Sequence, residues 1–478
     1  MTFSFYWHDY ETWGADPRRD RPVQFAGLRT DGDLNPVGEP LVIYCRPSDD
    51  ILPQPEACMI TGLTPQLALR EGLNEAEFVA RIHHELATPE TCGLGYNTLR
   101  FDDEVTRFAL YRNFYDPYAR EWRNGCSRWD IIDMVRLTHA LRPEGIEWPL
   151  SESGKVSFRL ELLSAANGIA HESAHDALSD VRATIALAKL IKQRQPRLYD
   201  YLLSGRDKQT LGERLNLQQR RPVLHVSSMY PVEQGCLAMV MPLIRHPENP
   251  NGVIVYDLRH DPAPLLQLSA EEIHQRLFTP ASDLPQGVER IPLKVVHLNK
   301  CPVVVPMSTL TGEAADRWSI DVAAGERYRK QLLEQKGLEQ KLQAVYRMSQ
   351  FDPISDPDQS LYSGGFFSRD DRQRMDRILQ SEPSALGDFP LVFDDPRLPE
   401  MLFRYRARNW PETLSEEERE RWREYRSTRL TESDAGGSIT LDEYLATLDR
   451  LDADPQLPAE KRALISQLLA WAEQIAPD

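Results

Sequence analysis

Residues 3–10 read Phe-Ser-Phe-Tyr-Trp-His-Asp-Tyr, an aromatic stretch that predicts a β-strand. Gln24–Thr30 and Leu41–Cys45 predict two more strands, because turn-forming Asp, Gly, Asn and Pro residues separate them. Glu75–Leu86 has apolar residues at helical spacing, and Thr91–Tyr96 predicts a short buried strand. Further helices are predicted at Asp103–Tyr115 and Ala174–Lys192. This mixture of strands and helices predicts an α/β domain.

The character of the sequence changes after residue 195, where β-type runs alternate with Pro, Asn and Gly. They predict a small β-rich domain, such as a barrel, with one helix. The runs are Pro222–Ser228, Leu237–Ile244, Gly252–Leu258 and Pro292–Val305, and the helix is Ala270–Phe278. The Pro- and Asp-rich segment Asp352–Pro357 predicts a linker, and the rest of the chain is mostly helical in pattern. We therefore predict three domains, at 1–195, 196–350 and 358–478.

The net charge of −17 argues against a nucleic-acid ligand at first sight, because phosphate contacts need Lys and Arg. The distribution of charge weakens that argument. Residues 411–478 hold 16 acidic and 8 basic side chains, a net −8. Arg-rich stretches at 100–142 and 404–408 leave room for a local positive channel.

The six cysteines show no close pairing at metal-ligand spacing, which excludes zinc ribbons and redox CxxC motifs. We expect reduced, buried thiols, and we expect any metal to be held by carboxylate oxygens. No apolar run approaches the ~20 residues that span a bilayer. The N-terminus lacks a basic leader and a cleavage site, so a cytoplasmic protein is expected. No dimer-forming stripe is apparent, so we expect a monomer.

Two carboxylates, Asp9 and Glu11, end the first predicted strand. Side chains two positions apart on a strand point to the same face, where these two would repel each other. A hard divalent cation, which prefers oxygen ligands, would relieve that repulsion. Taken alone, the pair is more often a solvated Asp and Glu on an edge strand.

Two more acidic elements follow. Asp102 and Asp103 stand where a strand passes into a helix, and the alternative role for one of them is to cap that helix. His175 lies five residues before Asp180, so a helix beginning near residue 176 would present Asp180 while the preceding loop brings His175 toward the same site. We predict a single site from Asp9, Glu11, Asp102, His175 and Asp180.

This set resembles the DEDD exonuclease superfamily, in the subgroup that carries a histidine. The shared motifs are Asp-x-Glu, Asn-x-x-x-Phe-Asp ending at Asp102, and His-x-x-x-x-Asp. The other subgroup has a Tyr four residues before the last Asp, where this chain has Asp176. Ile60–Thr64 resembles the loop that holds the 3′-terminal nucleotide in this family. The resemblance favours Asp102 over Asp103, because the family places its acid directly after the Phe.

Longer segments are similar to the bacterial exonuclease I family. They are His8–Gly14, Arg100–Arg107, Tyr111–Tyr118, Leu141–Gly145, Asn299–Pro302 and Tyr405–Asn409. The resemblance implies an α/β RNase H-like exonuclease domain, an SH3-like β-barrel domain with an inserted helix, and a helical C-terminal domain, which enclose a groove around single-stranded DNA. It also implies processive 3′→5′ degradation to 5′-mononucleotides in DNA repair and recombination.

The chemistry of such a site needs these residue types. Four carboxylates suit two Mg²⁺ ions ~4 Å apart, with Mn²⁺ as a substitute; one ion activates water and both stabilise charge in the transition state. His175 is suited to take the proton of that water, because an ordinary His pKa lies near 6.5. We expect Asp9 to bridge the ions, Glu11 to bind one and contact the 3′-hydroxyl, and Asp102 and Asp180 to complete the ligand set.

Arginines and aromatic residues interleave after the second acidic element, a pattern that suits single strands, since Arg meets phosphate and rings stack on bases. They are Arg107, Arg112, Tyr118, Trp122 and Arg128. The alternative is that the rings are core and the arginines a solvated face. The resemblance implies further substrate contacts from Glu11, Thr12, Ile60, Asn97 and Arg159.

Tyr405–Arg408 either closes the groove or forms a basic helix face packed on acidic neighbours, two alternatives that we weigh about equally. The resemblance implies a partner, the acidic C-terminal tail of single-stranded DNA-binding protein, with Arg142 and Tyr201 at matching positions. Around Thr309–Gly312 the chain carries fewer positive charges than such a pocket would suggest.

Two other functions remain open from the sequence. One is an RNA-trimming or proofreading exonuclease of the same superfamily, although ~280 residues after the catalytic domain argue against those compact enzymes. The other is a binding scaffold with an inactive nuclease domain, which the full set of carboxylates and His175 disfavours.

Overall fold

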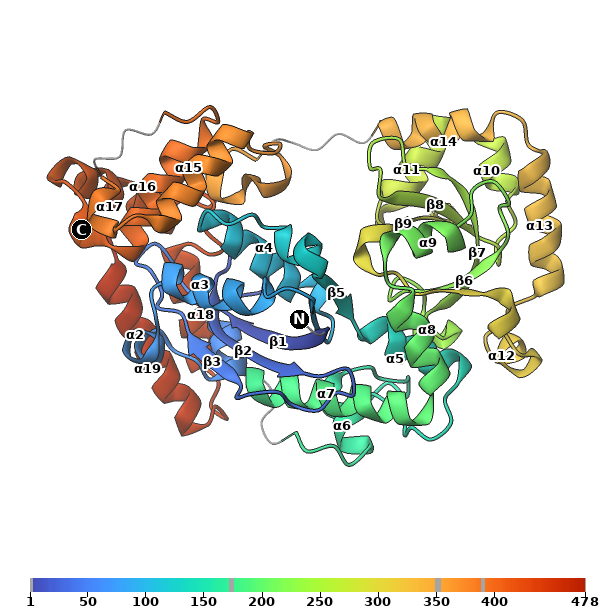
Figure 1. Cartoon of the computed structure of the whole chain (residues 1–478), viewed down its shortest axis with the longest axis horizontal. Coiled ribbons are helices and arrows are strands. Elements are labelled where there is room, and N and C mark those ends of the chain that lie inside the picture. Colours follow the sequence, from blue (N-terminus) through green and yellow to red (C-terminus); the bar gives the residue numbers. More distant parts are fainter. Residues whose placement is uncertain (1–2, 172–175, 349–353, 388–391, 478) are drawn as a thin grey trace. The chain divides into compact units, whose positions relative to one another are not determined.

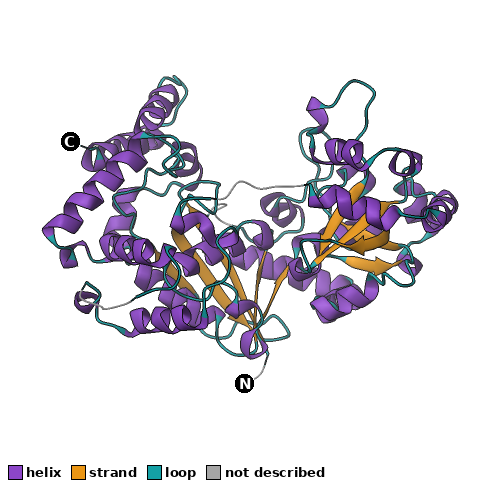
Figure 2. Cartoon of the chain, turned by 90° about the horizontal axis from the view of Figure 1, so that it is seen from above, coloured by secondary structure: helices purple, strands orange, loops and turns teal. Residues whose placement is uncertain are grey.

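The computed structural model describes residues 3–171, 176–348, 354–387 and 392–477. These divide into two compact units, each made of separate chain segments. The first unit comprises Met1–Arg128, His171–Ile185 and Pro353–Asp478, and the second comprises Trp129–Ala170 and Ala186–Asp352. Figure 2 shows one β-sheet in each part of the molecule, with helices packed around both.

The first sheet has five strands in the order β3-β2-β1-β4-β5. Their bounds are β1 Ser4–Thr12, β2 Pro22–Thr30, β3 Leu41–Tyr44, β4 Thr91–Gly95 and β5 Ser127–Asp130, and the two units divide within β5. The central strand β1 pairs antiparallel with β2 and parallel with β4. Since β1 runs to Thr12, both Asp9 and Glu11 belong to the sheet, and its register with β2 shifts after Glu11.

Side-chain alternation along β1 builds the core of this sheet. Tyr6 and Tyr10 point to one face, where they pack with Phe25 of β2. Helices α3 (Glu75–Leu86) and α4 (Asp102–Arg112) cover that face with apolar residues at helical spacing, as Figure 1 shows. The N-cap residue of α3, Asn74, accepts a hydrogen bond from the Glu77 backbone N–H at 2.9 Å, which fixes the start of that helix.

The second unit contains an antiparallel sheet in the order β10-β6-β7-β8-β9. Its strands are β6 Val223–Val226, β7 Leu237–Arg245, β8 Gly252–Asp257, β9 Leu293–His297 and β10 Val304–Pro306. The single run predicted at Pro292–Val305 is wrong, because β9 and β10 are separate strands at opposite edges of the sheet. Between them the chain forms a 3₁₀ turn at Leu298–Lys300, and Cys301 follows this turn with φ +42°, a left-handed conformation.

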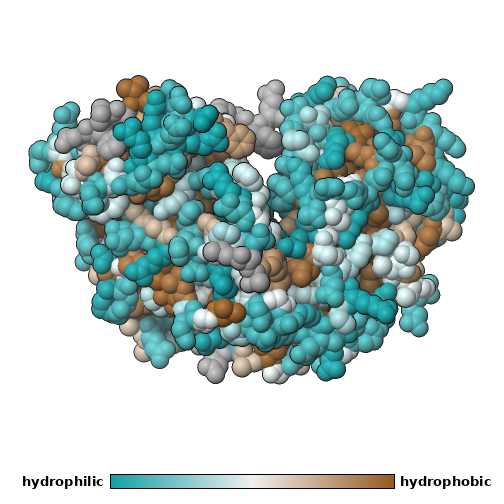
Figure 3. Space-filling view, in the orientation of Figure 1, coloured by the Kyte–Doolittle hydropathy of each residue, from teal (hydrophilic) through white to brown (hydrophobic). Residues whose placement is uncertain are grey.

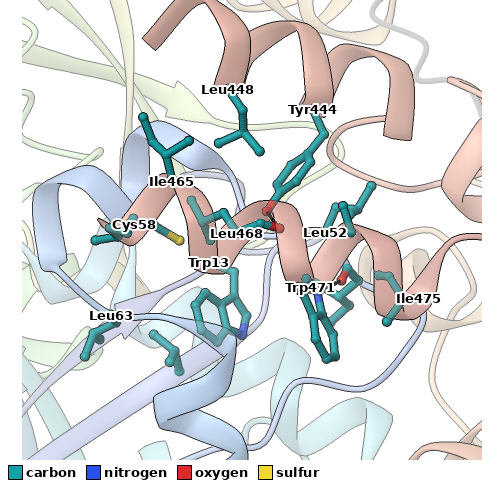
Figure 4. Close-up of a cluster of buried hydrophobic side chains, with 14 of the residues drawn as sticks. Trp13, Leu52, Cys58, Leu63, Tyr444, Leu448, Ile465, Leu468, Trp471 and Ile475 are labelled. Carbon is teal, nitrogen blue, oxygen red and sulfur yellow. Dashed lines mark hydrogen bonds between the residues drawn. The ribbon is translucent and has the colours of Figure 1, made fainter. Parts of the chain in front are cut away.

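The helices after residue 353 form a small apolar cluster of their own around Phe403 and Trp422, and they also share larger clusters with the N-terminal part of the first unit. Trp13, Ile51 and Leu52 share one apolar cluster with Tyr444 and Trp471 of the C-terminal helices (Figure 4). The Trp471 indole Nε1–H donates to the Ile51 carbonyl at 3.0 Å. This part of the first unit therefore completes its core only with residues from the C-terminus.

A buried arginine–aspartate cluster joins the same chain segments. Asp50 is 1% exposed and lies 3.1 Å from Arg21, 3.0 Å from Arg408 and 3.6 Å from Arg429. Arg408 also contacts Asp358 at 2.8 Å. The three guanidinium groups hold the pKa of the Asp50 carboxyl well below its usual range, although burial alone would raise it.

The remaining helices complete the two units. In the first they are α1 Pro55–Thr61, α2 Pro65–Glu71, α15 Arg369–Gln380, α16 Arg397–Asn409, α17 Glu416–Thr431, α18 Leu441–Asp452 and α19 Ala459–Ile475. In the second they are α5 Ile132–Leu141, α6 Leu160–Ala166, α8 Pro196–Ser204, α9 Lys208–Arg214, α10 Ala263–Gln267, α11 Ala270–Phe278, α12 Gly312–Arg317, α13 Val322–Glu334 and α14 Leu338–Arg347. Helix α7, Ala177–Arg194, begins in the first unit and ends in the second.

The predicted fold class is confirmed: a mixed sheet with helices, then an antiparallel sheet, then a helical C-terminal part. The exact boundaries at 195, 196–350 and 358 stay predictions. The face drawn in Figure 3 is mostly hydrophilic, with small apolar areas. Among the helices of the described residues, none combines the length and apolar character needed to cross a membrane.

Candidate active site

Three carboxylates meet at the end of β1. Asp9 and Glu11 share one face of the strand, and Asp180 comes from the first turn of α7. One ligand oxygen from each lies within 4.8 Å of the others. Three acids from two distant segments converge here, which matches the oxygen-rich coordination that hard divalent cations require.

Burial and mutual repulsion of the carboxylates raise the pKa values of Asp9 and Glu11. The pKa of Asp9 is raised well above its ordinary value, first by burial and then by repulsion from Asp102, Asp180 and Glu11. The pKa of Glu11 is raised to about 8, by burial and by repulsion from Asp180 and Asp102. A bound cation would remove both penalties at once, so the residues present fit a divalent metal.

Replacing Glu11 should stabilise the metal-free protein. Its carboxyl ionises near 4.5 in an unfolded chain and near 8 in the fold, so the folded state holds a proton that the unfolded state has lost at neutral pH. Stability therefore falls as the pH rises above about 4.5, and the full penalty is present above pH 8. We expect Glu11→Gln to raise the free energy of unfolding by about 4 kcal/mol at pH 8, because each pKa unit corresponds to about 1.36 kcal/mol, and to leave it unchanged at pH 4. Thermal melts in EDTA measure this, and an equal gain at both pH values would contradict the charge explanation.

Asp102 and Asp103 have different surroundings although they are adjacent at the start of α4. One oxygen of Asp102 accepts the Tyr10 backbone N–H at 3.0 Å, which holds its carboxylate beside β1. Asp103 instead pairs with Arg120 at 2.6 Å and Arg128 at 2.9 Å, and these cations lower its pKa. The negative charge of Asp103 is thus compensated by two arginines inside the fold. This geometry supports the prediction that Asp102, rather than Asp103, is the metal ligand.

The predicted base, His175, lies outside the described residues. A different histidine, His171, contacts the cluster: its Nε2 is within hydrogen-bond distance of Asp180 Oδ1. His171 was not predicted as a residue of the site. Its signal was present, because His171 and His175 stand four residues apart just before the last acid.

The residues predicted to hold the 3′ end lie on the first unit. The Thr12 hydroxyl is buried and donates to the Gly14 carbonyl at 2.6 Å, and the side chain of Ile60, near the end of α1, is 61% exposed. Asn97 follows β4 with φ +64°, a left-handed turn that carries the chain toward Asp102. Their roles stay predictions.

Two of the predicted phosphate-binding arginines, Arg107 and Arg112, form ion pairs with acids of the protein. Arg107 Nε lies 2.7 Å from Glu121, and Arg112 Nη2 lies 2.7 Å from Glu75. Both arginine side chains are buried, with 5% of Arg107 and 4% of Arg112 exposed. A phosphate contact would require these ion pairs to open, so the geometry favours a structural role for both.

The aromatic residues of the same stretch are more accessible. Trp122 is 63% exposed, and the Arg123 guanidinium lies 5.5 Å from the centre of its ring. Tyr118 is half-buried and contacts Phe366, which is 88% exposed, with ring centres 6.1 Å apart. Tyr118 and Phe366 line a pocket of ≈ 440 Å³, together with Arg123 and other arginines. Phe366 was not predicted, since its neighbours in the fold are remote in sequence.

Three predicted contact residues belong to the second unit. Arg159 is 70% exposed and pairs with Glu161. Arg142 Nη2 donates to the Thr309 carbonyl at 3.3 Å, and the ring of Tyr201 lies 4.0 Å from the Arg214 guanidinium carbon. Arg214 therefore places a positive charge beside the ring of Tyr201.

The Tyr405–Arg408 segment forms part of α16, and the structure shows the second of its two alternatives. Arg406 pairs with Glu418, and Arg408 joins the buried cluster around Asp50. The basic face of this helix thus packs on acidic neighbours.

Three family models match successive parts of the chain. Family models described as "Exonuclease", "Exonuclease I SH3-like domain" and "Exonuclease I C-terminal domain" match residues 6–188, 206–348 and 355–475. The chain is 47% identical to exodeoxyribonuclease I of Escherichia coli (strain K12) over 473 residues, which cover 99% of this chain and 98% of that protein.

Solved structures agree. Exonuclease I from Methylocaldum szegediense, described as moderately thermophilic, has 54% identity and a TM-score of 0.95, with 99% of each chain covered. E. coli exonuclease I in complex with a dA16 oligonucleotide has 47% identity and a TM-score of 0.94, covering 99% and 100%. An ExoI/SSB-Ct complex has 46% identity and a TM-score of 0.91, covering 100% of both chains. With this identity over its full length, a converging carboxylate cluster and matches to all three family models, the chain belongs to the exodeoxyribonuclease I family.

Proposed function

We propose that this protein is a 3′→5′ exonuclease that degrades single-stranded DNA to 5′-mononucleotides, processively, in DNA repair and recombination. The observation that carries the proposal is the convergence of Asp9, Glu11 and Asp180 at the end of β1. Membership of the exodeoxyribonuclease I family and the oligonucleotide complex of a full-length relative support the choice of substrate.

Asp9, Glu11, Asp102 and Asp180 would hold two Mg²⁺ ions, which Mn²⁺ could replace. When bound, these ions supply Lewis acidity and neutralise charge that develops on the phosphoryl oxygens. The chain's own contribution is to fix the ligands: β1 holds Asp9 and Glu11, the Tyr10 N–H holds Asp102, and α7 holds Asp180.

The reaction is hydrolysis of the last phosphodiester bond. The oxygen of water attacks the phosphorus, the bond from phosphorus to the 3′-oxygen of the preceding nucleotide breaks, and that oxygen gains a proton. His175 accepts the proton of the attacking water, a role suited to an imidazole near neutral pH. Glu11 and Thr12 orient the terminal 3′-hydroxyl, and Ile60 and Asn97 support the terminal nucleotide.

The substrate assignment is tested with matched 5′-labelled DNA and RNA oligonucleotides in magnesium. We expect successive shortening of the DNA from its 3′ end and little loss of the RNA. Faster loss of RNA would overturn the choice of DNA, and loss of neither strand by the metal-loaded protein would overturn the enzymatic proposal.

Trp122 and Tyr118 are proposed to stack on bases, because exposed rings beside arginines suit single strands. Trp122→Ala should weaken binding of an oligodeoxythymidylate by about 1–3 kcal/mol. Fluorescence anisotropy with Ca²⁺ in place of Mg²⁺ measures binding without turnover. The control is Val392→Ala, which trims another exposed apolar side chain of the first unit, 78% accessible. Equal affinities in the two variants would remove Trp122 from the substrate path.

We propose Arg159, whose side chain is 70% exposed, as a direct contact to the DNA backbone. Arg107 and Arg112 are proposed to contact the substrate only when their ion pairs with Glu121 and Glu75 open on binding. For Arg142 and Tyr201 we propose a role in binding the acidic C-terminal tail of single-stranded DNA-binding protein, supported by the ExoI/SSB-Ct complex of a relative. A monomer acting in the cytoplasm fits these partners.

A further inference from the structure

Among the histidines that the structure describes, His171 contacts the carboxylate cluster of Asp9, Glu11 and Asp180. It precedes α7, and its Nε2 lies within hydrogen-bond distance of Asp180 Oδ1. An ionised carboxylate can only accept a hydrogen bond, so the Nε2–H of His171 is the donor. The contact joins the cluster to a side chain nine residues earlier in the sequence.

The imidazole is buried, with 7% of its side chain exposed. Its Nδ1 has no hydrogen-bond partner among the described residues. Burying a ring nitrogen without a partner is unfavourable, so packing alone does not explain a histidine at this position. Its one recorded polar contact in the described chain is with Asp180.

The contact leaves Asp180 able to serve the metal site. A ligand oxygen of Asp180 lies within 4.8 Å of ligand oxygens of Asp9 and Glu11, so Asp180 belongs to the metal-binding geometry while His171 contacts its Oδ1. A hydrogen bond to one oxygen also fixes the rotation of the carboxylate plane, which decides where the other oxygen points. Outer-sphere partners of this kind orient metal ligands and strengthen metal binding.

We propose that His171 is a positioning residue of the metal centre, which holds Asp180 through Oδ1 in the orientation that binds a divalent cation; this rests on the proposed function. Asp9 and Glu11 are fixed by the backbone of β1, whereas Asp180 lies in the first turn of a helix. Asp180 is therefore the ligand of the three that gains most from a side-chain restraint.

The test uses His171→Leu and His171→Gln in the full-length protein. Leu removes the donor, whereas the Gln side-chain N–H can still reach the same oxygen. Titration calorimetry with Mn²⁺, in the absence of DNA, should show affinity weakened about 10- to 100-fold in His171→Leu and largely restored in His171→Gln. The Mg²⁺ concentration for half-maximal hydrolysis should shift in parallel, with the maximal rate recovered at high Mg²⁺.

The matched control is His84→Leu, which changes an exposed histidine of α3 in the same unit. It should bind Mn²⁺ as the unchanged protein does. Unaltered Mn²⁺ affinity in His171→Leu would overturn the proposal. A rate loss in His171→Leu that neither excess Mg²⁺ nor Gln restores would also overturn it, because a base or a direct ligand behaves that way. If the unchanged protein binds Mn²⁺ but hydrolyses no DNA, the proposed function fails while the Mn²⁺ titration still decides the role of His171.

Discussion

Asp9→Asn is expected to lower the rate of single-stranded DNA hydrolysis by about 10³-fold. Asp9 lies within the cluster, where burial and the charges of Asp102, Asp180 and Glu11 raise its pKa. The amide keeps the shape of the side chain but carries no charge to hold a divalent cation. Metal ions contribute several kcal/mol to such reactions, and each 1.36 kcal/mol corresponds to a factor of ten.

The measurement is single-turnover shortening of a 5′-labelled oligodeoxythymidylate, with DNA binding recorded separately by anisotropy. Binding should persist or tighten in Asp9→Asn, because a negative charge is removed from a site that receives phosphates. Asp449→Asn is the control, since Asp449 is an exposed acid on α18. A rate within tenfold of the unchanged protein would show that this carboxylate takes no part in the reaction.

Asp50→Ala is expected to lower the free energy of the first unfolding transition by about 3–5 kcal/mol. Arg21, Arg408 and Arg429 surround Asp50, and their side chains are only 6%, 3% and 6% exposed. Removing the acid leaves buried positive charges facing each other without compensation. Arg408 keeps its contact with Asp358, which limits the loss.

Denaturant unfolding followed by tryptophan fluorescence measures this loss. Asp50→Asn separates shape from charge: it preserves the volume of the side chain, yet should be nearly as damaging as Ala if the ion pairs are responsible. Asp449→Ala provides the baseline for an exposed aspartate and should change stability by less than about 0.5 kcal/mol. Similar stabilities for Asp50→Ala and Asp449→Ala would mean that the buried cluster contributes nothing.

Elements with strong local patterns could be predicted from the sequence. Glu75–Leu86 was predicted with the observed bounds of α3, because its apolar residues recur at helical spacing. The division between β9 and β10 could not be predicted in this way, because it depends on the left-handed conformation of Cys301, a residue with no turn preference. The packing of Trp471 against Ile51 has no local signal either, since the two residues are 420 positions apart.

The candidate site shows the same contrast. Asp9, Glu11 and Asp180 could be predicted because their motifs are short and contiguous, and the structure brings them together. Whether a given arginine binds phosphate or forms an internal ion pair could not be predicted, because the sequence does not show which acid lies beside its guanidinium group. Arg112 pairs with Glu75, 37 positions away, and only the fold shows that contact.

The discontinuity of the first unit has a consequence for synthesis of the chain. Residues around Trp13 and Leu52 leave the ribosome early, but the apolar surface that covers them belongs to α19, Ala459–Ile475. At translation rates of ~5–20 residues per second, roughly 20–80 seconds pass before that helix emerges. During this interval the nascent chain displays an uncovered apolar surface around Trp13 and Leu52. Chaperones that bind exposed apolar segments therefore have a defined target on the unfinished protein, which disappears when the last helix docks.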